Sequence, residues 1–279
     1  MASPAYALGA AVIWAITPIY YRGFLSKVDF LNFNLLRTSA SAAALAIPAI
    51  YFWEFNGLGF AVLSGVITLA CGDSFFLLAL REVGASVASP VVYTYVLMIQ
   101  FVAAAAGQVV PVANFAAAAM VIGGVYLLSR GGEGRLRPRG IGYAICAGVV
   151  WTFGQELVQT STSAGGNFIA VAFTRDLSAA LALAVAVALT RKTRPWPSGL
   201  TVRDYGLMCG FTISDLALGS SLFVYSVAAA GVALTVILTS LSPLLTQVLA
   251  KALGKESPST RDFAGGLLIV AALVLVVAV

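Results

Sequence analysis

The chain has 279 residues, of which 60% are hydrophobic and 10% are charged, and its formal net charge is +5. A mean hydropathy of +0.97 excludes an ordinary soluble domain, because so few charged side chains cannot cover its surface. No histidine is present, which excludes a Ser-His-Asp triad and a His-ligated metal site.

Ten apolar runs follow one another along the chain, separated by Gly, Pro, Asn and charged residues. Each has roughly the 20 residues that a helix needs to cross the hydrocarbon core of a bilayer. Their continuous Ala, Leu and Val stretches differ from the alternating strands of a membrane barrel. We therefore predict an all-α polytopic membrane protein with ten transmembrane helices, at residues 5–21, 30–52, 58–80, 85–107, 112–129, 141–160, 168–190, 202–227, 231–250 and 263–279.

A hydrophilic segment near the midpoint, residues 130–140, separates the fifth run from the sixth. Its glycines and Pro138 are not expected to sustain a helix, and its arginines cannot lie in hydrocarbon. The chain is therefore predicted to consist of a first unit at residues 1–129, this basic linker, and a second unit at residues 141–279.

The cations of the predicted loops are distributed very unevenly. The loops after spans 1, 3, 5, 7 and 9 contain fourteen Lys and Arg residues, whereas the other loops and both termini contain none. Cytoplasmic loops of membrane proteins are enriched in Lys and Arg. We therefore expect a multi-pass protein of the cell (plasma or inner) membrane with its basic loops in the cytoplasm and both termini outside.

The two halves of the chain resemble each other. The segment that ends at Trp14 resembles the one that ends at Trp151, and Arg37 and Arg175 follow similar Asp-Phe and Asn-Phe pairs at the same spacing. A unit of five spans, an odd number, enters the membrane from opposite sides in its two copies. The prediction is thus of two inverted five-helix repeats, with a substrate site near the midplane between them.

Several motifs carry a resemblance to a known family. The segment 84–90, Gly-Ala-Ser-Val-Ala-Ser-Pro, enters span 4, and the segment 242–250, Ser-Pro-Leu-Leu-Thr-Gln-Val-Leu-Ala, is followed by Gly-Lys-Glu at 254–256. Together with two five-helix halves and a Trp in the first helix of each, they resemble the EamA family of the drug/metabolite transporter superfamily. The resemblance covers essentially the whole chain. It implies a secondary transporter, commonly an exporter of amino acids or other small metabolites, that works by alternating access.

Polar and aromatic residues inside the spans are the candidate substrate ligands, because polar groups in spans usually face the bundle interior or a water-filled cavity. On span 4, Tyr93 and Gln100 fall on one helical face, and Ser240 and Gln247 are their equivalents on span 9. The Trp in the first helix of each half is expected in a cavity wall or in packing. The substrate-binding set is therefore Trp14, Tyr93, Gln100, Trp151, Ser240 and Gln247.

Three acids within the spans, Asp73, Glu156 and Asp215, are the candidates for proton coupling. A carboxylate outside bulk water is destabilised as an anion, so it can be protonated in one state and ionised in another. Glu156 is the first choice, although it could also lie close enough to the outer surface to be hydrated. Asp176 is expected to be held ionised by the adjacent Arg175.

Arg37 and Arg175 are the only cations inside the predicted spans away from their ends. As gating residues, each would pair with a carboxylate when its side of the carrier is closed. The alternative is that each arginine lies near a helix end and extends to the membrane interface.

These features favour a secondary active transporter, an exporter by resemblance, of small polar or zwitterionic metabolites such as amino acids. Proton coupling is one option, and a facilitator without ion coupling is the other. A carrier of lipophilic cations or nucleosides is the alternative, whereas a scaffold or an intramembrane enzyme fits the repeat poorly. No Walker sequence or metal-ligand spacing is present, so we expect no enzyme activity and no cofactor. The expected partners are the substrate and membrane lipids, without nucleic acid, for a monomeric chain.

Overall fold

The structure is a computed structural model that describes residues 3–52, 54, 56–105, 113–130, 137–190, 197 and 199–278. Over that part of the chain every regular element is a helix, and five of the helices are long and apolar enough to cross a membrane. The predicted all-α fold of two inverted five-helix repeats is confirmed.

The first repeat contains spans 1 to 5, two of which are divided into shorter elements. Its elements are α1 (Ser3–Phe24), α2 (Phe30–Tyr51), α3 (Leu58–Ser64), η1 (Gly65–Gly72), α4 (Asp73–Val83), α5 (Ala85–Val92), α6 (Tyr95–Ala105) and α7 (Ala113–Arg130). Span 3 runs continuously through α3, η1 and α4, and span 4 consists of α5 and α6.

The second repeat has the same order of elements. They are α8 (Pro138–Ser163), α9 (Phe168–Thr190), α10 (Val202–Thr212), η2 (Ile213–Ser220), α11 (Ser221–Thr239), α12 (Ser242–Ala252) and α13 (Thr260–Ala278). Span 8 runs through α10, η2 and the first part of α11. Span 9 begins within α11, at Gly231, and continues in α12.

The repeats share their irregularities as well as their helices. Spans 3 and 8 each contain an eight-residue π-helical segment, η1 and η2. Gly84 and Gly231 begin spans 4 and 9 with nearly the same backbone conformation, φ 79° and φ 82°. Glycine is the residue that adopts a positive φ without a steric penalty. Because π-helical segments occur frequently at functional sites, this shared irregularity directs attention to spans 3 and 8.

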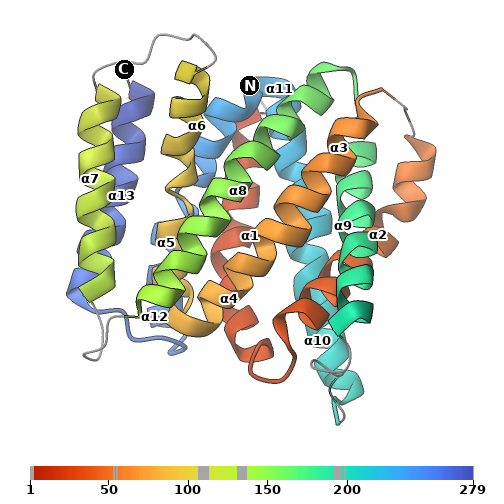
Figure 1. The fold of residues 1–279 in the computed structure, drawn as a ribbon, viewed down its shortest axis with the longest axis horizontal. Coiled ribbons are helices and arrows are strands. Elements are labelled where there is room, and N and C mark those ends of the chain that lie inside the picture. The colour runs from red at the N-terminus through yellow and green to blue at the C-terminus, as the bar shows by residue number, and fades with distance from the viewer. Residues whose placement is uncertain are drawn as a thin grey trace.

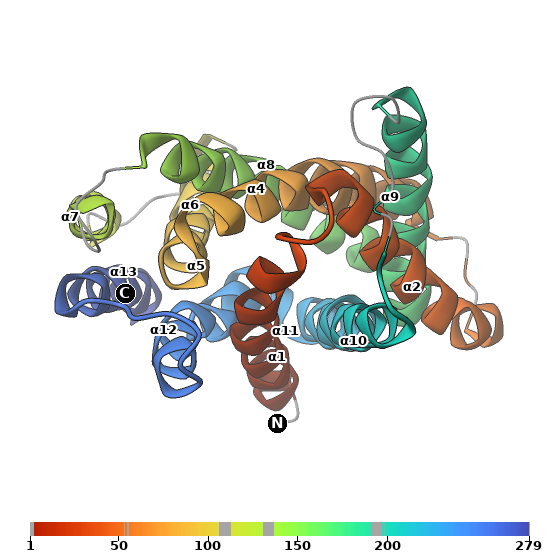
Figure 2. The same cartoon turned by 90° about the horizontal axis from the view of Figure 1, so that it is seen from below.

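The helices form two broad layers with a helix pair at each edge (Figure 2). One layer contains α4 and α8, which pack against each other, and the other contains α1 with α11 and α12. The pair α7 and α13 forms one edge, and the pair α2 and α9 forms the other. Since each edge pair joins one helix from each repeat, both edges connect the two halves.

Both chain ends lie at one end of the bundle, and α1, α4, α7, α9 and α12 run toward the opposite end (Figure 1). The loops predicted to be basic therefore follow helices that finish at the same end, called the basic end below.

The linker differs in one detail from the prediction. Pro138 is the first residue of α8 and Arg130 the last of α7, so both ends of the predicted linker are helical. Proline is tolerated in the first helical turn, where its missing N–H has no intrahelical acceptor. The linker residues 131–136 lie outside the described residues.

Candidate functional site

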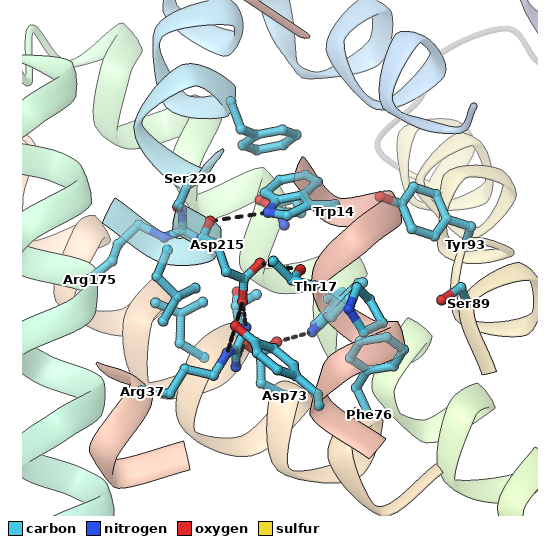
Figure 3. A pocket seen from close by; sticks show the side chains of 18 of the residues that line it. Trp14, Thr17, Arg37, Asp73, Phe76, Ser89, Tyr93, Arg175, Asp215 and Ser220 are labelled. Carbon is cyan, nitrogen blue, oxygen red and sulfur yellow. Dashed lines mark hydrogen bonds and ion pairs between the residues drawn. The ribbon is translucent and has the colours of Figure 1, made fainter. Parts of the chain in front are cut away.

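A pocket lies between the two repeats, with ≈ 670 Å³ of empty space including its open mouth (Figure 3). α1, α2, η1, α4, α5 and α6 line it from the first repeat, and α8, α9, η2 and α11 line it from the second. Both π-helical segments contribute to its wall.

An ion-pair cluster occupies one side of the pocket. Arg37 of α2 lies between two acids, with its Nη1 2.7 Å from Asp73 Oδ2 and its Nη2 2.6 Å from Asp215 Oδ2. The Nε of Arg37 donates a second bond to Asp215, at 2.9 Å. All three side chains are buried. A buried carboxylate requires such compensation, because loss of hydration penalises an isolated charge by several kcal/mol.

Hydroxyl and indole groups fix the two acids of this cluster. Tyr21 Oη donates to Asp215 Oδ2 at 2.7 Å, and Thr17 Oγ1 donates to Asp215 Oδ1 at 3.3 Å. Trp151 Nε1 donates to Asp73 Oδ1 at 2.9 Å. Because Tyr21 and Trp151 each bond an acid of the other repeat, the cluster joins the two halves of the protein.

The two tryptophans occupy equivalent positions in the repeats and act in similar ways. Trp14 Nε1 donates to the backbone oxygen of Asp215 at 3.3 Å, so each indole contacts the acid-bearing span of the other repeat. Trp151 packs edge-on against Tyr95 at a centroid distance of 5.8 Å, and Trp14 packs against Phe223 at 5.3 Å. The pocket therefore has apolar aromatic walls beside its charged cluster.

Arg175 of α9 is the second cation on the pocket wall, and it has different partners. Its Nε donates to Ser64 Oγ at 3.1 Å and its Nη1 to Ser220 Oγ at 3.1 Å. Among the described residues it forms no ion pair with a carboxylate. Ser220 occupies the position in span 8 that Asp73 occupies in span 3, so Arg175 meets a hydroxyl where Arg37 meets a carboxylate. A positive charge on the pocket wall is thus left for an anionic group.

The predicted substrate ligands are not all at the pocket. Trp14, Tyr93 and Trp151 line it, whereas Ser240 and Gln247 are buried elsewhere in the bundle. Gln247 Nε2 donates to the backbone oxygens of Ser86 and Asp262, both at 2.9 Å, and so links α12 to α5 and α13. The side chain of Gln100, the remaining candidate, lies outside the described part of the chain.

The predicted coupling and gating residues are also divided. Asp73 and Asp215 line the pocket together with both arginines. Glu156 of α8 is half-exposed and is not among the lining residues.

Polar residues that the sequence analysis did not select also contribute to the site, among them Thr17, Tyr21, Ser64 and Ser220. A signal for Ser220 was present, because the offset that matches Gly84 with Gly231 also matches Asp73 with Ser220.

Comparison with known proteins identifies the family. No curated protein sequence matches the chain. Several solved structures match, and one of them, a crystal structure, does so over 99% of this chain and 95% of its own, with a TM-score of 0.73 and 18% sequence identity. At that identity the likeness shows the fold alone. The model of the EamA-like transporter family matches residues 2–130 and 139–278, one match for each repeat. With matches over nearly its whole length, the chain belongs to the EamA-like transporter family, whose members are membrane transporters and not enzymes.

Proposed function

We propose that this transporter is a secondary carrier of small zwitterionic metabolites such as amino acids, which bind in the pocket between the repeats. The observation that carries the proposal is the separation of charge on the pocket wall. The cluster of Arg37, Asp73 and Asp215 contains one positive and two negative groups, whereas Arg175 has no carboxylate partner among the described residues. A zwitterion matches both sites.

The two sites have hydrogen-bonding capacity for the carboxylate and the ammonium group of a zwitterion. A guanidinium has five N–H donors arranged in a planar fork that suits a carboxylate. Arg175 is seen to use two of its donors on the hydroxyls of Ser64 and Ser220. At the other site, Asp73 Oδ1 accepts one bond, from Trp151. A carboxylate oxygen can accept two bonds, so a substrate ammonium group can approach this atom.

The alternative substrates fit this wall less well. A lipophilic cation would bring a positive charge to Arg175, and a nucleoside has no carboxylate for it. The aromatic rings of Trp14, Tyr95 and Trp151 suit an amino acid with an apolar side chain, because such rings stabilise bound apolar groups.

Alternating access requires contacts that open in turn at the two ends of the bundle, and matching contacts exist at the starts of spans 4 and 9. At the basic end, Glu256 accepts bonds from the backbone N–H groups of Ala85 and Ser86, at 2.8 and 2.9 Å. At the opposite end, Gln159 Oε1 accepts a bond from the N–H of Val232, at 2.7 Å. We propose these two helix caps as the gate contacts, because the first joins the loop between spans 9 and 10 to span 4, and the second joins span 6 to span 9.

The direction of transport depends on solute gradients, because the chain has no ATP-binding motif. We propose export as the physiological direction, following the common activity of the family, with the basic loops in the cytoplasm and both termini outside. Export then follows the outward gradient of a metabolite that the cell accumulates.

Counterflow in proteoliposomes tests the carrier and its substrate class together. Vesicles are loaded with each of the common amino acids, with choline or with a nucleoside, and the entry of the same labelled solute is measured. We expect counterflow with neutral amino acids. Counterflow with choline or nucleosides alone would overturn the zwitterion proposal.

The role of Arg175 in binding the substrate carboxylate is tested with Arg175→Gln and Arg175→Lys. We expect Arg175→Gln to weaken binding of a counterflow-active amino acid about tenfold to a hundredfold, since a hydrogen-bonded charge pair contributes about 1.5–3 kcal/mol. Arg175→Lys should recover part of this loss, because it keeps the charge without the planar fork. An Arg175→Gln protein with unchanged affinity would show that the carboxylate binds elsewhere.

A further inference from the structure

A third buried acid, Asp176 of α9, lies outside the pocket and is incompletely paired. Its side chain is fully buried, and its Oδ2 accepts a hydrogen bond from Ser41 of α2. Its Oδ1 has no hydrogen-bond partner among the described residues. A buried anion normally receives several donors, so one donor for two oxygens leaves the Asp176 carboxylate poorly stabilised and ready to bind a proton.

The balance of charge around the pocket leads to the same conclusion. Two arginines and three aspartates are buried in this region: Arg37, Arg175, Asp73, Asp176 and Asp215. With all five ionised, one negative charge is in excess. Asp73 and Asp215 are both in ion pairs with Arg37, whereas Asp176 forms none with any residue that the structure describes. The excess negative charge therefore falls on Asp176, where a proton can neutralise it.

Few other charges act on Asp176. Arg175 on its own helix, Arg37 on α2 and Asp215 on η2 influence it electrostatically. The other elements packed against α9 are α3, η1, α11 and α8. The first three contain no charged residue, and α8 brings only the half-exposed Glu156 and the exposed Arg139.

Arg175 connects this acid to the pocket. It precedes Asp176 directly, and successive residues of a helix point about 100° apart. Arg175 therefore lines the pocket while Asp176 faces Ser41. Without substrate, the positive charge of Arg175 holds Asp176 in its ionised form, as the sequence analysis expected. A substrate carboxylate on Arg175 cancels this charge and favours the proton.

We propose that Asp176 is a proton-binding site, separate from the substrate pocket, that takes up a proton when a substrate carboxylate binds Arg175. The inference rests on the proposed function. By thermodynamic reciprocity, a proton on Asp176 also strengthens substrate binding. Substrate and proton then cross the membrane together, so export with a proton is driven by the outward gradient of the substrate.

The decisive experiment measures proton uptake and substrate affinity on the intact purified protein. A mixture of L-leucine, L-phenylalanine and L-threonine is added in weak buffer with a pH-indicator dye. We expect wild-type protein to take up protons on binding, and its affinity to fall with rising pH by up to about tenfold per unit. Asp176→Asn mimics the protonated acid, so it should take up no protons and bind with an affinity independent of pH.

Two further variants keep the inference open to refutation. Glu156→Gln is the matched control, because it removes another acid of the spans, and it should keep the wild-type pH dependence. Ser41→Ala removes the donor to the ionised form of Asp176, so the pH midpoint of proton uptake should rise. This measurement does not require Asp176→Asn to fold. Proton release on binding, or pH dependence that survives Asp176→Asn and disappears in Glu156→Gln, would overturn the inference. Absence of amino-acid counterflow in the wild type would instead refute the proposed function.

Discussion

Arg37 and Arg175 occupy equivalent positions in the two repeats but have different environments. Arg37 is compensated by two carboxylates, and Arg175 by two serine hydroxyls. The inverted repeat supplies the same helix geometry twice, so the difference arises from the partner residues. The first arginine pairs with one acid from each repeat, and the second is the one to which the proposed function assigns the substrate carboxylate.

Removal of Arg37 should destabilise the protein strongly. In Arg37→Gln, Asp73 and Asp215 lose their cation while remaining buried, and breaking a buried pair in this way destabilises proteins by about 3–5 kcal/mol. We expect a markedly lower temperature of unfolding in detergent, measured by the loss of the monodisperse peak in size-exclusion chromatography.

The control for this prediction is Arg22→Gln. Arg22 pairs with Glu256 at 3.2 Å, but its side chain is 45% exposed, and exposed pairs contribute about 0–1 kcal/mol. Adding Asp215→Asn to Arg37→Gln should restore part of the stability by removing one uncompensated charge. Equal effects of Arg37→Gln and Arg22→Gln would contradict the account of the cluster.

At the scale of the elements, the π-helical segments bring the tryptophans close to the acids. Gly72, at the end of η1, lies against Trp151, and Gly219, near the end of η2, lies against Trp14. A Cβ on Gly72 would lie 2.5 Å from Trp151 Cδ1, and a Cβ on Gly219 would lie 2.9 Å from Trp14 Nε1. Both distances are too short for non-bonded atoms, so the absence of a side chain allows each indole to reach its acceptor.

Gly72→Ala should therefore displace Trp151 and break its bond to Asp73. We expect a changed tryptophan emission spectrum and an amino-acid affinity that falls about tenfold, the effect of about 1.4 kcal/mol. Gly142→Ala on α8 is the matched control, because nothing lies within 4 Å of the Cβ that it would add. There the substitution should leave affinity unchanged and stabilise the helix slightly. Unchanged emission in Gly72→Ala would refute this packing role.

The sequence predicted the spans and part of the site for identifiable physical reasons. Asp73, Asp215 and the two arginines stood out because charges in apolar helices need partners, and the repeat marked Trp14 and Trp151 as a pair. The prediction that Tyr93 and Gln100 share a helical face, as do Ser240 and Gln247, requires that spans 4 and 9 are unbroken helices. Spans 4 and 9 instead break at residues 93–94 and 240–241, so residues before and after a break do not share a face. The π-helical segments left no signal in the apolar pattern, because their backbone bonding does not depend on hydrophobicity.

At the scale of the whole molecule, the inverted repeat and the charge of the loops predict an orientation. The helices that precede the basic loops all finish at one end of the bundle, and both chain ends lie at the other (Figure 1). Lys and Arg are retained on the cytoplasmic side of a membrane. Successive spans alternate in direction, so the basic loops, which all follow odd-numbered spans, lie on one side. A single labelled site at each end is therefore enough to determine the orientation.

Two introduced cysteines test this orientation in whole cells after replacement of Cys71, Cys146 and Cys209. Ala164→Cys lies after α8 at the end that holds the termini, and Lys255→Cys lies between α12 and α13 at the basic end; both positions are exposed. A membrane-impermeant maleimide should label the cysteine at position 164 in intact cells and the cysteine at position 255 only after permeabilisation. Each variant must still perform amino-acid counterflow, which confirms that the protein is folded. Labelling at position 255 but not 164 in intact cells would reverse the orientation and place the Glu256 contact at the outer gate. Labelling at both positions before permeabilisation would show that the protein inserts in both directions, as expected only if the loop charges do not control its insertion.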